Sequence, residues 1–154
     1  MKYILTAFIL GIIFCFLVLN LLSSSMEFPL TLFPGNVSGP GDDIKENQIQ
    51  VYNDKIIIEI ENASIGRYAA TGSMTPVLNE NSNGIRVPVY SEKDIQVGDI
   101  ITFSDGNELI VHRVIEKGED LEGVYFITKG DNNSYADGKI RFEQIKYKTI
   151  GVLW

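Results

Sequence analysis

The chain has 154 residues, with 20 Asp and Glu against 13 Lys and Arg, and a formal net charge of −7 at pH 7. This length fits one domain, and the acidic balance excludes a nucleic-acid partner, because phosphate binding requires a basic face. The single Cys and the single His exclude a disulfide framework and a multi-histidine zinc site. Because the mean hydropathy is nevertheless slightly positive, we expect an apolar segment joined to an acidic domain.

The apolar segment is predicted within residues 1–25. Over residues 3–22, seventeen side chains are apolar and none is charged. As a helix this run would be about 30 Å long, the thickness of a hydrocarbon core, and we predict a transmembrane anchor. Lys2 precedes the run and no basic residue follows before Lys45. The positive-inside rule therefore predicts a cytoplasmic N-terminus and an extracytoplasmic domain.

The same run has an alternative interpretation as a cleaved signal peptide. Ser23 and Ser25 are small residues three and one positions before a cut that would follow Ser25. The apolar run is longer than the usual core of such peptides, about 7–15 residues. We therefore favour a retained anchor and a single-pass protein of the cell membrane.

Two further regions follow the anchor. Residues 26–48 predict a flexible linker, because their Pro and Gly residues break both helix and strand. Residues 49–154 predict a β-rich domain, with strands over 49–61, 85–90, 99–103, 109–116, 123–129 and 140–154, and turns at Asn83-Gly84, Asp105-Gly106, Lys117-Gly118, Lys129-Gly130 and Asp137-Gly138. Short strands at this spacing favour a mainly β fold, a small antiparallel coiled sheet or barrel-like domain.

The first segment that carries chemistry is Thr71-Gly72-Ser73-Met74-Thr75-Pro76. The glycine before Ser73 and the proline after it predict a sharp turn that displays the Ser73 hydroxyl. Taken alone, the segment is more typical of an ordinary turn than of a catalytic site.

The second such segment contains His112, which strand alternation places on the same face as Ile110 and Val114. The imidazole is therefore expected to be half-buried among aliphatic side chains. A hydrogen-bonded core histidine and a catalytic histidine explain this placement about equally well. Arg113 is expected on the opposite face, as a surface charge or paired with an acid.

A third segment runs from Thr128 to Asn133 and is followed by Asp137; by itself it predicts a polar turn. Together with Val97-Gly98-Asp99-Ile100, and in this order, the segments resemble the signal peptidase I family, specifically its archaeal and endoplasmic-reticulum branch. That branch has histidine as the general base where the bacterial branch has lysine. His112 stands at this position, and the resemblance covers residues 66–154.

The resemblance implies a serine endopeptidase. Ser73 would be the nucleophile and His112 its general base, because a serine hydroxyl needs a base and imidazole can accept a proton near pH 7. An aspartate would orient the imidazole. Asp137 is favoured for this role over Asp131, which would support the site. The backbone N–H of Ser73 would stabilise the oxyanion, and no metal or organic cofactor is required.

The resemblance also implies the substrates, which are secreted and membrane preproteins with small residues at the first and third positions before the cut. The family binds them as an extended strand. We expect Tyr68, Ala69 and Ala70 to pair with this peptide, and Met74 to contribute to its binding. The lipid bilayer and the protein-translocation machinery are the other expected partners.

One departure from the family is the distance of about fifty residues between the apolar run and Ser73. In the family the anchor usually leads almost directly to the catalytic serine, so the position of this domain relative to the bilayer stays open. An alternative of a different class is a noncatalytic, membrane-anchored β domain that binds extended peptides or a protein partner. Cleavage assays with Ser73 and His112 variants distinguish the two.

Overall fold

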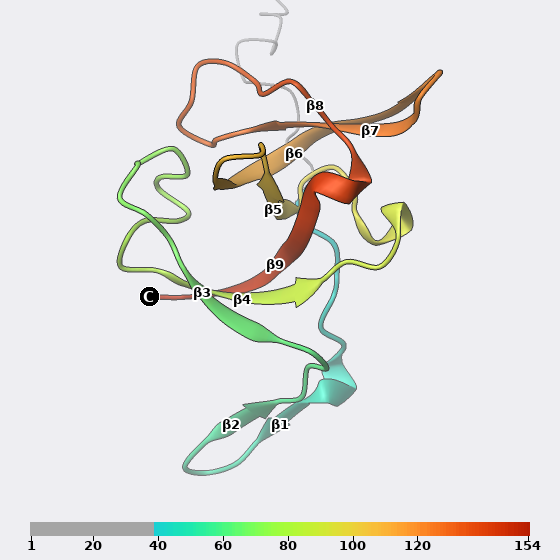
Figure 1. Cartoon of the computed structure of the whole chain (residues 1–154). Helices are drawn as coiled ribbons and strands as arrows, with labels where there is room; N and C mark the ends of the chain where they lie inside the picture. Colours follow the sequence, from blue (N-terminus) through green and yellow to red (C-terminus); the bar gives the residue numbers. More distant parts are fainter. Residues whose placement is uncertain (1–38) are drawn as a thin grey trace, which may run out of the picture. The chain divides into compact units, whose positions relative to one another are not determined.

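A computed structural model describes residues 39–154 (Figure 1). The predicted anchor over residues 3–22 and the first part of the predicted linker lie outside the described residues. Within residues 39–154, no helix is long and apolar enough to cross a membrane.

The described residues form a two-stranded hairpin and a seven-stranded antiparallel sheet (Figure 1). The hairpin pairs β1 (Ile49–Val51) with β2 (Ile56–Ile58). The sheet has the spatial order β3 (Ser64–Arg67), β4 (Asn83–Pro88), β9 (Ile145–Leu153), β5 (Ile100–Ser104), β6 (Leu109–Asp120), β7 (Gly123–Lys129) and β8 (Lys139–Ile140). Three short 3₁₀ helices lie in its connections, η2 (Glu46–Gln48), η3 (Glu92–Asp94) and η4 (Phe142–Gln144).

The predicted mainly β, antiparallel fold class is confirmed. The seven-stranded order begins at β3 and ends at β8, and these two strands do not pair, so the sheet formed by residues 39–154 is not closed. The single strand predicted over residues 49–61 is wrong, because the polar sequence Asn53-Asp54-Lys55 makes a turn that divides it into β1 and β2. Strand β3 was not expected, since four residues carry too short an alternation to predict a strand. The single strand predicted over residues 140–154 is wrong, because η4 divides it into β8 and β9.

Two predicted turns are wrong because their glycines lie inside strands. Asn83-Gly84 begins β4, and Lys117-Gly118 lies within β6. In each strand the glycine leaves room for an aromatic ring: a Cβ on Gly84 would overlap the Tyr68 hydroxyl, and a Cβ on Gly118 would lie 2.5 Å from the Tyr125 ring. Glycine in a strand is typical of such close approach.

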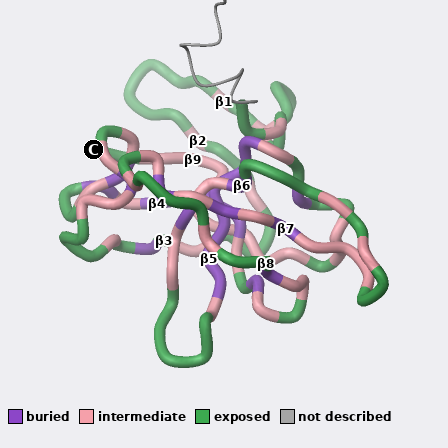
Figure 2. The backbone as a smooth tube through the Cα atoms, turned by 90° about the horizontal axis from the view of Figure 1, so that it is seen from above, coloured by how far each residue is buried: buried purple, intermediate pink, exposed green. Residues whose placement is uncertain are grey.

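The core has two clusters of buried apolar side chains. Figure 2 marks the buried stretches of the backbone in purple. The larger comprises Ile95, Ile101, Phe103, Val114, Phe126, Ile140 and Ile145. The smaller comprises Met74, Leu78 and Ile100. Met74 follows Ser73 directly, so the smaller cluster holds the backbone beside the candidate nucleophile.

The described end of the predicted linker packs against the sheet. The Gly41 N–H donates to Asp99 Oδ1 at 3.0 Å, and Lys148 Nζ donates to Asp43 Oδ1 at 2.5 Å. Asp99 is fully buried and Lys148 nearly so. These contacts fix where the chain enters the domain, immediately before η2 and β1.

Candidate active site

Ser73 lies on a loop whose turn requires Gly72. Gly72 has a φ of 71°, in the left-handed region that favours glycine. Its carbonyl accepts hydrogen bonds from the Thr75 N–H at 3.2 Å and from Thr75 Oγ1 at 2.8 Å. The Ser73 hydroxyl is displayed from this turn, and its Oγ lies 3.2 Å from Thr71 Oγ1.

A second loop, residues 130–133, supports the Ser73 loop from the side. The Asn132 N–H donates to the Ser73 carbonyl at 2.9 Å, and the Asn132 side chain donates to the Gly72 carbonyl at 3.2 Å. Gly130 is buried against the same carbonyl: a Cβ there would lie 2.6 Å from Ser73 O and 2.7 Å from Asn133 Nδ2. The two loops therefore hold the candidate nucleophile in one position.

We predict that Gly130→Ala displaces the Ser73 backbone. The added methyl would meet a backbone oxygen that cannot rotate away, which costs about 1–3 kcal/mol of unfolding free energy. Urea unfolding followed by circular dichroism measures this cost. Gly138→Ala is the matched control, because a Cβ there has nothing within 4 Å; equal stability of the two variants would contradict this packing.

His112 lies on β6 with its imidazole buried, 7% exposed as a residue, and its ring centroid lies 6.4 Å from that of Phe103. His112 Nδ1 is 2.6 Å from Asp137 Oδ2, and the same oxygen accepts a hydrogen bond from Thr128 Oγ1 at 2.6 Å. The Asp137 N–H in turn donates to the Thr128 carbonyl at 2.8 Å. The carboxylate is thus held in place by Thr128 and faces the imidazole.

This pairing determines which imidazole nitrogen can act as a base. A carboxylate only accepts hydrogen bonds, so the Nδ1 that faces Asp137 carries the proton. His112 Nε2 is then the unprotonated nitrogen, as general base catalysis requires. The side-chain amide nitrogen of Asn133 lies 3.5 Å from Nε2.

Asp131 has a different partner. Its carboxylate accepts two hydrogen bonds from Arg113, Nε to Oδ1 at 2.8 Å and Nη2 to Oδ2 at 2.7 Å, and Arg113 Nη1 donates to the Gly98 carbonyl at 2.8 Å. These hydrogen bonds raise the pKa of Arg113, against the opposing effect of its burial. His112 and Arg113 are neighbours on β6, and each binds one of the two candidate aspartates.

We predict that Arg113→Met destabilises the domain by about 3–5 kcal/mol, because it leaves the largely buried Asp131 carboxylate without its partner. The measurement is the urea unfolding free energy at pH 7. The double variant Arg113→Met with Asp131→Leu should recover most of this loss, since it removes the unpaired charge as well. A single variant as stable as the parent chain would contradict the structural role of the pair.

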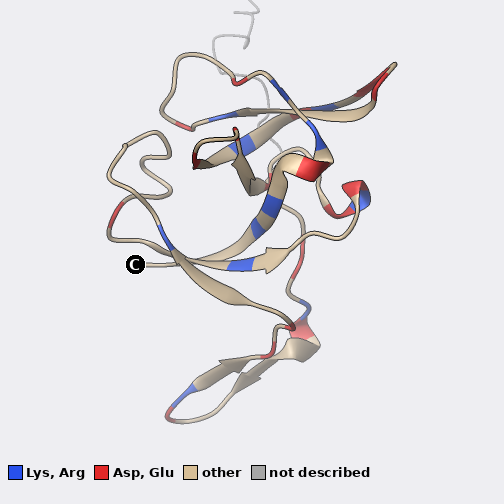
Figure 3. Cartoon of the chain, in the orientation of Figure 1, with Lys and Arg blue, Asp and Glu red and all other residues tan. Residues whose placement is uncertain are grey.

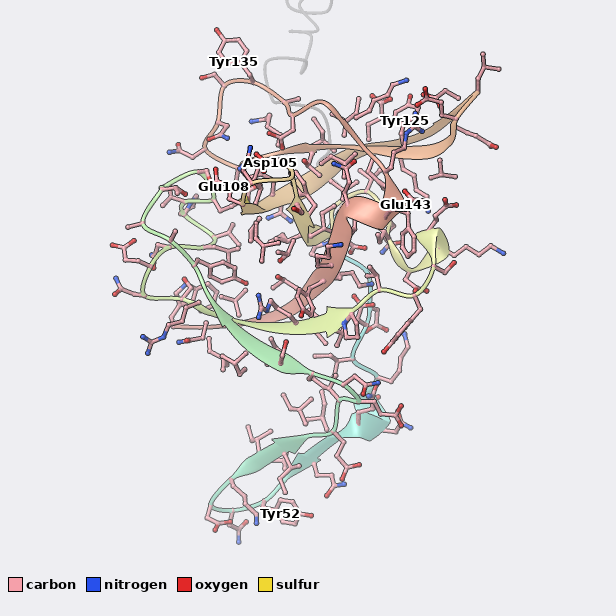
Figure 4. All side chains as sticks on the ribbon, in the orientation of Figure 1. Tyr52, Asp105, Glu108, Tyr125, Tyr135 and Glu143 are labelled. Atoms are coloured by element: carbon pink, nitrogen blue, oxygen red, sulfur yellow. The ribbon has the colours of Figure 1, made fainter. Side chains whose placement is uncertain are left out.

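Ser73 and His112 line one cavity of about 480 Å³, which Tyr68, Ala69 and Met74 also line. Glu108, on the turn between β5 and β6, also lines this cavity and is labelled in Figure 4. No hydrogen bond joins Ser73 to His112 within the described part of the chain, and the Ser73 hydroxyl contacts Thr71 instead. Catalytic hydrogen bonds are often long without substrate and tighten when it binds.

The residues expected to bind substrate take different positions. Tyr68 is half-buried, with its hydroxyl 3.3 Å from Thr149 Oγ1. Ala69 and Ala70 are exposed, and Ala70 is not part of the cavity wall. Met74 is buried in the smaller core cluster and borders the cavity.

Sequence reasoning did not assign roles to the hydroxyls of Thr71 and Thr128. Thr71 lies two residues before Ser73, and Thr128 lies directly before the Lys129 to Asn133 segment. Their roles depend on how the two loops meet, and a local motif does not show this. Among residues 39–154, no group of three His, Cys, Asp or Glu side chains is arranged to hold a metal ion.

Comparison with known proteins supports the signal peptidase I family. The chain is 38% identical over 68 residues to Signal peptidase I W of Bacillus subtilis (strain 168). The matched region covers 44% of this chain and 36% of that protein, so the chain spans about a third of the length of the curated relative that it matches. No family model matches the chain, and no solved structure matches it.

Proposed function

We propose that this chain is a membrane-bound serine endopeptidase of the signal peptidase I type, which removes signal peptides or similar segments from secreted and membrane preproteins. The observation that carries the proposal is the placement of Ser73 and the Asp137-paired His112 on one cavity. The similarity to a signal peptidase I supports the same reaction class.

In the proposed reaction, Ser73 Oγ attacks the carbonyl of the scissile peptide bond and His112 Nε2 takes its proton. A positioned base of this kind contributes about 10²–10⁴-fold in rate. Asp137 holds the imidazole and stabilises the imidazolium, which then protonates the leaving amine. The acyl group stays on Ser73 until water, activated by His112, releases it.

The oxyanion of each tetrahedral intermediate needs donors beside Ser73. The Ser73 N–H is the first of these, and in the substrate-free site it faces Thr71 Oγ1 at 3.4 Å. The Thr71 hydroxyl, 3.2 Å from Ser73 Oγ, is a second donor within reach of the reacting atoms. Both groups belong to the glycine turn that displays the nucleophile.

We propose that the chain belongs to the archaeal and endoplasmic-reticulum branch, and a histidine base supports this assignment. His112 pairs with Asp137 as a general base in that branch would. Lys129, the lysine of the third segment, donates to the Asn133 carbonyl at 2.5 Å and to the Gly130 carbonyl at 3.3 Å. Its ammonium therefore holds the supporting loop and is not directed at Ser73.

The substrate would bind as an extended strand beside the edge of β3. Strand β3 is an end strand of the described sheet and ends at Arg67, directly before Tyr68. An edge strand can pair with an added peptide through backbone hydrogen bonds, while side chains at alternate positions enter pockets. The cavity bounded by Tyr68 and Met74 would then receive small side chains before the cut.

The test is cleavage of a preprotein with alanine at the first and third positions before the cut, by the full chain in detergent. Mass spectrometry of the products should show a single cut after the second of these alanines. The control preprotein has leucine in place of the alanine next to the cut and should not be cleaved. Binding of the preprotein without cleavage would contradict the proposal and support the noncatalytic peptide-binding domain.

A further inference from the structure

The β1–β2 hairpin has one uncovered apolar face. In the antiparallel register Ile49 pairs with Ile58 and Val51 pairs with Ile56. Directly opposed residues share a face, and so do residues two apart on one strand, so these four side chains lie together. Their exposed fractions are 41% for Ile49, 74% for Val51, 63% for Ile56 and 41% for Ile58.

The opposite face of β1 is polar. Gln50 Oε1 accepts a hydrogen bond from the Tyr52 hydroxyl at 2.7 Å, and Gln50 Nε2 donates to Glu59 Oε1 at 3.4 Å. β1 therefore alternates as a strand that buries one face does, whereas in β2 the half-buried Ile57 lies beside Gln50 on the opposite face. A single exposed aliphatic side chain needs no explanation, but four on one face of a ribbon mark an interaction surface.

The chain composition indicates what covers this apolar face. The hairpin is the first described strand pair after the charge-free apolar run 3–22, which has the length of a bilayer crossing. Residues 23–38 can extend at most about 55 Å, and the contacts of Gly41 and Asp43 bring the chain into the domain just before β1. The hairpin is therefore joined to the predicted membrane crossing by a chain of limited length.

The charges of the hairpin argue against a second copy as the partner. Residues 46–61 contain four acidic side chains and one lysine. Figure 3 shows that the two strands carry no charge and that the charged residues lie at the turn and the base. Two copies placed face to face would bring like charges together. A neutral lipid surface has no such repulsion and accepts all four aliphatic side chains.

We propose that the apolar face formed by Ile49, Val51, Ile56 and Ile58 lies in the interfacial layer of a neutral lipid bilayer and docks the domain there. Tyr52 at the tip of the hairpin (Figure 4) and Lys55 in the turn suit this depth, where aromatic rings and snorkelling lysines are found. Within residues 39–154 no further strand pairs with the outer edges of the hairpin. Backbone groups without partners are costly in hydrocarbon, so the hairpin lies at the interface and does not enter the hydrocarbon core. The inference rests on the membrane location proposed above, but not on peptidase activity.

The test uses nitroxide labels on the full chain reconstituted in phosphatidylcholine vesicles, with Cys15 replaced by Ser. A label at Val51→Cys should be far more accessible to oxygen than to a water-soluble nickel complex. The ratio of the two accessibilities should place the label at a depth of about 5–10 Å. The matched control is Leu121→Cys, which is fully exposed on the β6–β7 turn and should report water. Adding Ile56→Asp beside the Val51 label should return that label to water.

Four results would overturn the docking. A label at position 51 as accessible to nickel as the one at position 121 would show that the face is in water. Dipolar broadening would show a second copy, and protection from both reagents would show a protein segment such as residues 3–22. Failure of the chain to float with the vesicles would overturn both the docking and the membrane location, whereas cleavage of a soluble peptide by the same preparation tests the peptidase separately.

Discussion

Replacing Ser73 by Ala is expected to lower kcat for preprotein cleavage by about 10⁴-fold or more, to the detection limit of the assay. The variant removes the atom that forms the acyl-enzyme in the proposed reaction. Thr71 Oγ1 is 3.2 Å from Ser73 Oγ, but in the proposed reaction it donates to the oxyanion and does not attack the substrate. Single-turnover cleavage of the preprotein, followed by gel electrophoresis, measures the effect.

The matched control for this prediction is Ser134→Ala, which removes an exposed serine hydroxyl directly after the supporting loop 130–133. This variant should cleave at the rate of the parent chain and unfold at the same urea concentration. Cleavage by Ser73→Ala at the parental rate would exclude Ser73 as the nucleophile.

The second large effect is expected for Asp137→Asn, which should lower kcat by about 10³–10⁴-fold. The amide can turn its NH₂ group toward His112 Nδ1 and favour the tautomer with the proton on Nε2, which cannot accept a proton from Ser73. The hydrogen bond from Thr128 Oγ1 to the same oxygen is disturbed as well. Steady-state kinetics should show this loss mainly in kcat, with KM little changed.

Asp131→Asn is the matched control, because it makes the same chemical change six residues away. Asp131 binds Arg113 and not His112. Its replacement should lower the unfolding free energy while leaving kcat of the folded protein within about tenfold of the parent, since no proton transfer depends on it. A larger loss of kcat for Asp131→Asn than for Asp137→Asn would reverse the roles of the two aspartates.

The sequence alone predicted the mainly β fold and the three segments that the structure brings together. Strand character identified β7 with its bounds and β5 within one residue at each end. The prediction ended β6 four residues early, because Lys117-Gly118 was taken as a turn. Ser73 and His112 were proposed from the order of their motifs. The structure places both on one cavity.

The partners of these residues could not be predicted with the same certainty. Asp131 and Asp137 both follow β7, and the sequence left both as candidates for His112. The face of β6 decides between them: His112 points toward Asp137, and Arg113, its neighbour on the strand, points toward Asp131. Such pairing depends on how a loop returns across the sheet, a long-range property that local patterns do not contain.

The β1–β2 hairpin shows the same limit of prediction from local sequence patterns. Residues 49–61 have strand character throughout, and only the turn at Asn53 to Lys55 divides them. The sequence therefore predicted β structure correctly but missed the reversal that gathers four aliphatic side chains on one face.

The most direct test of the account is mass spectrometry of the full chain, acid-quenched within one turnover after mixing with a preprotein. The account predicts an adduct with the mass of the signal peptide less one water, ester-linked to the proteolytic fragment that contains Ser73. The adduct should be absent from Ser73→Ala and strongly reduced in His112→Ala. Cleavage at the parental rate in both variants, with no adduct on Ser73 in the parent chain, would contradict the proposed mechanism.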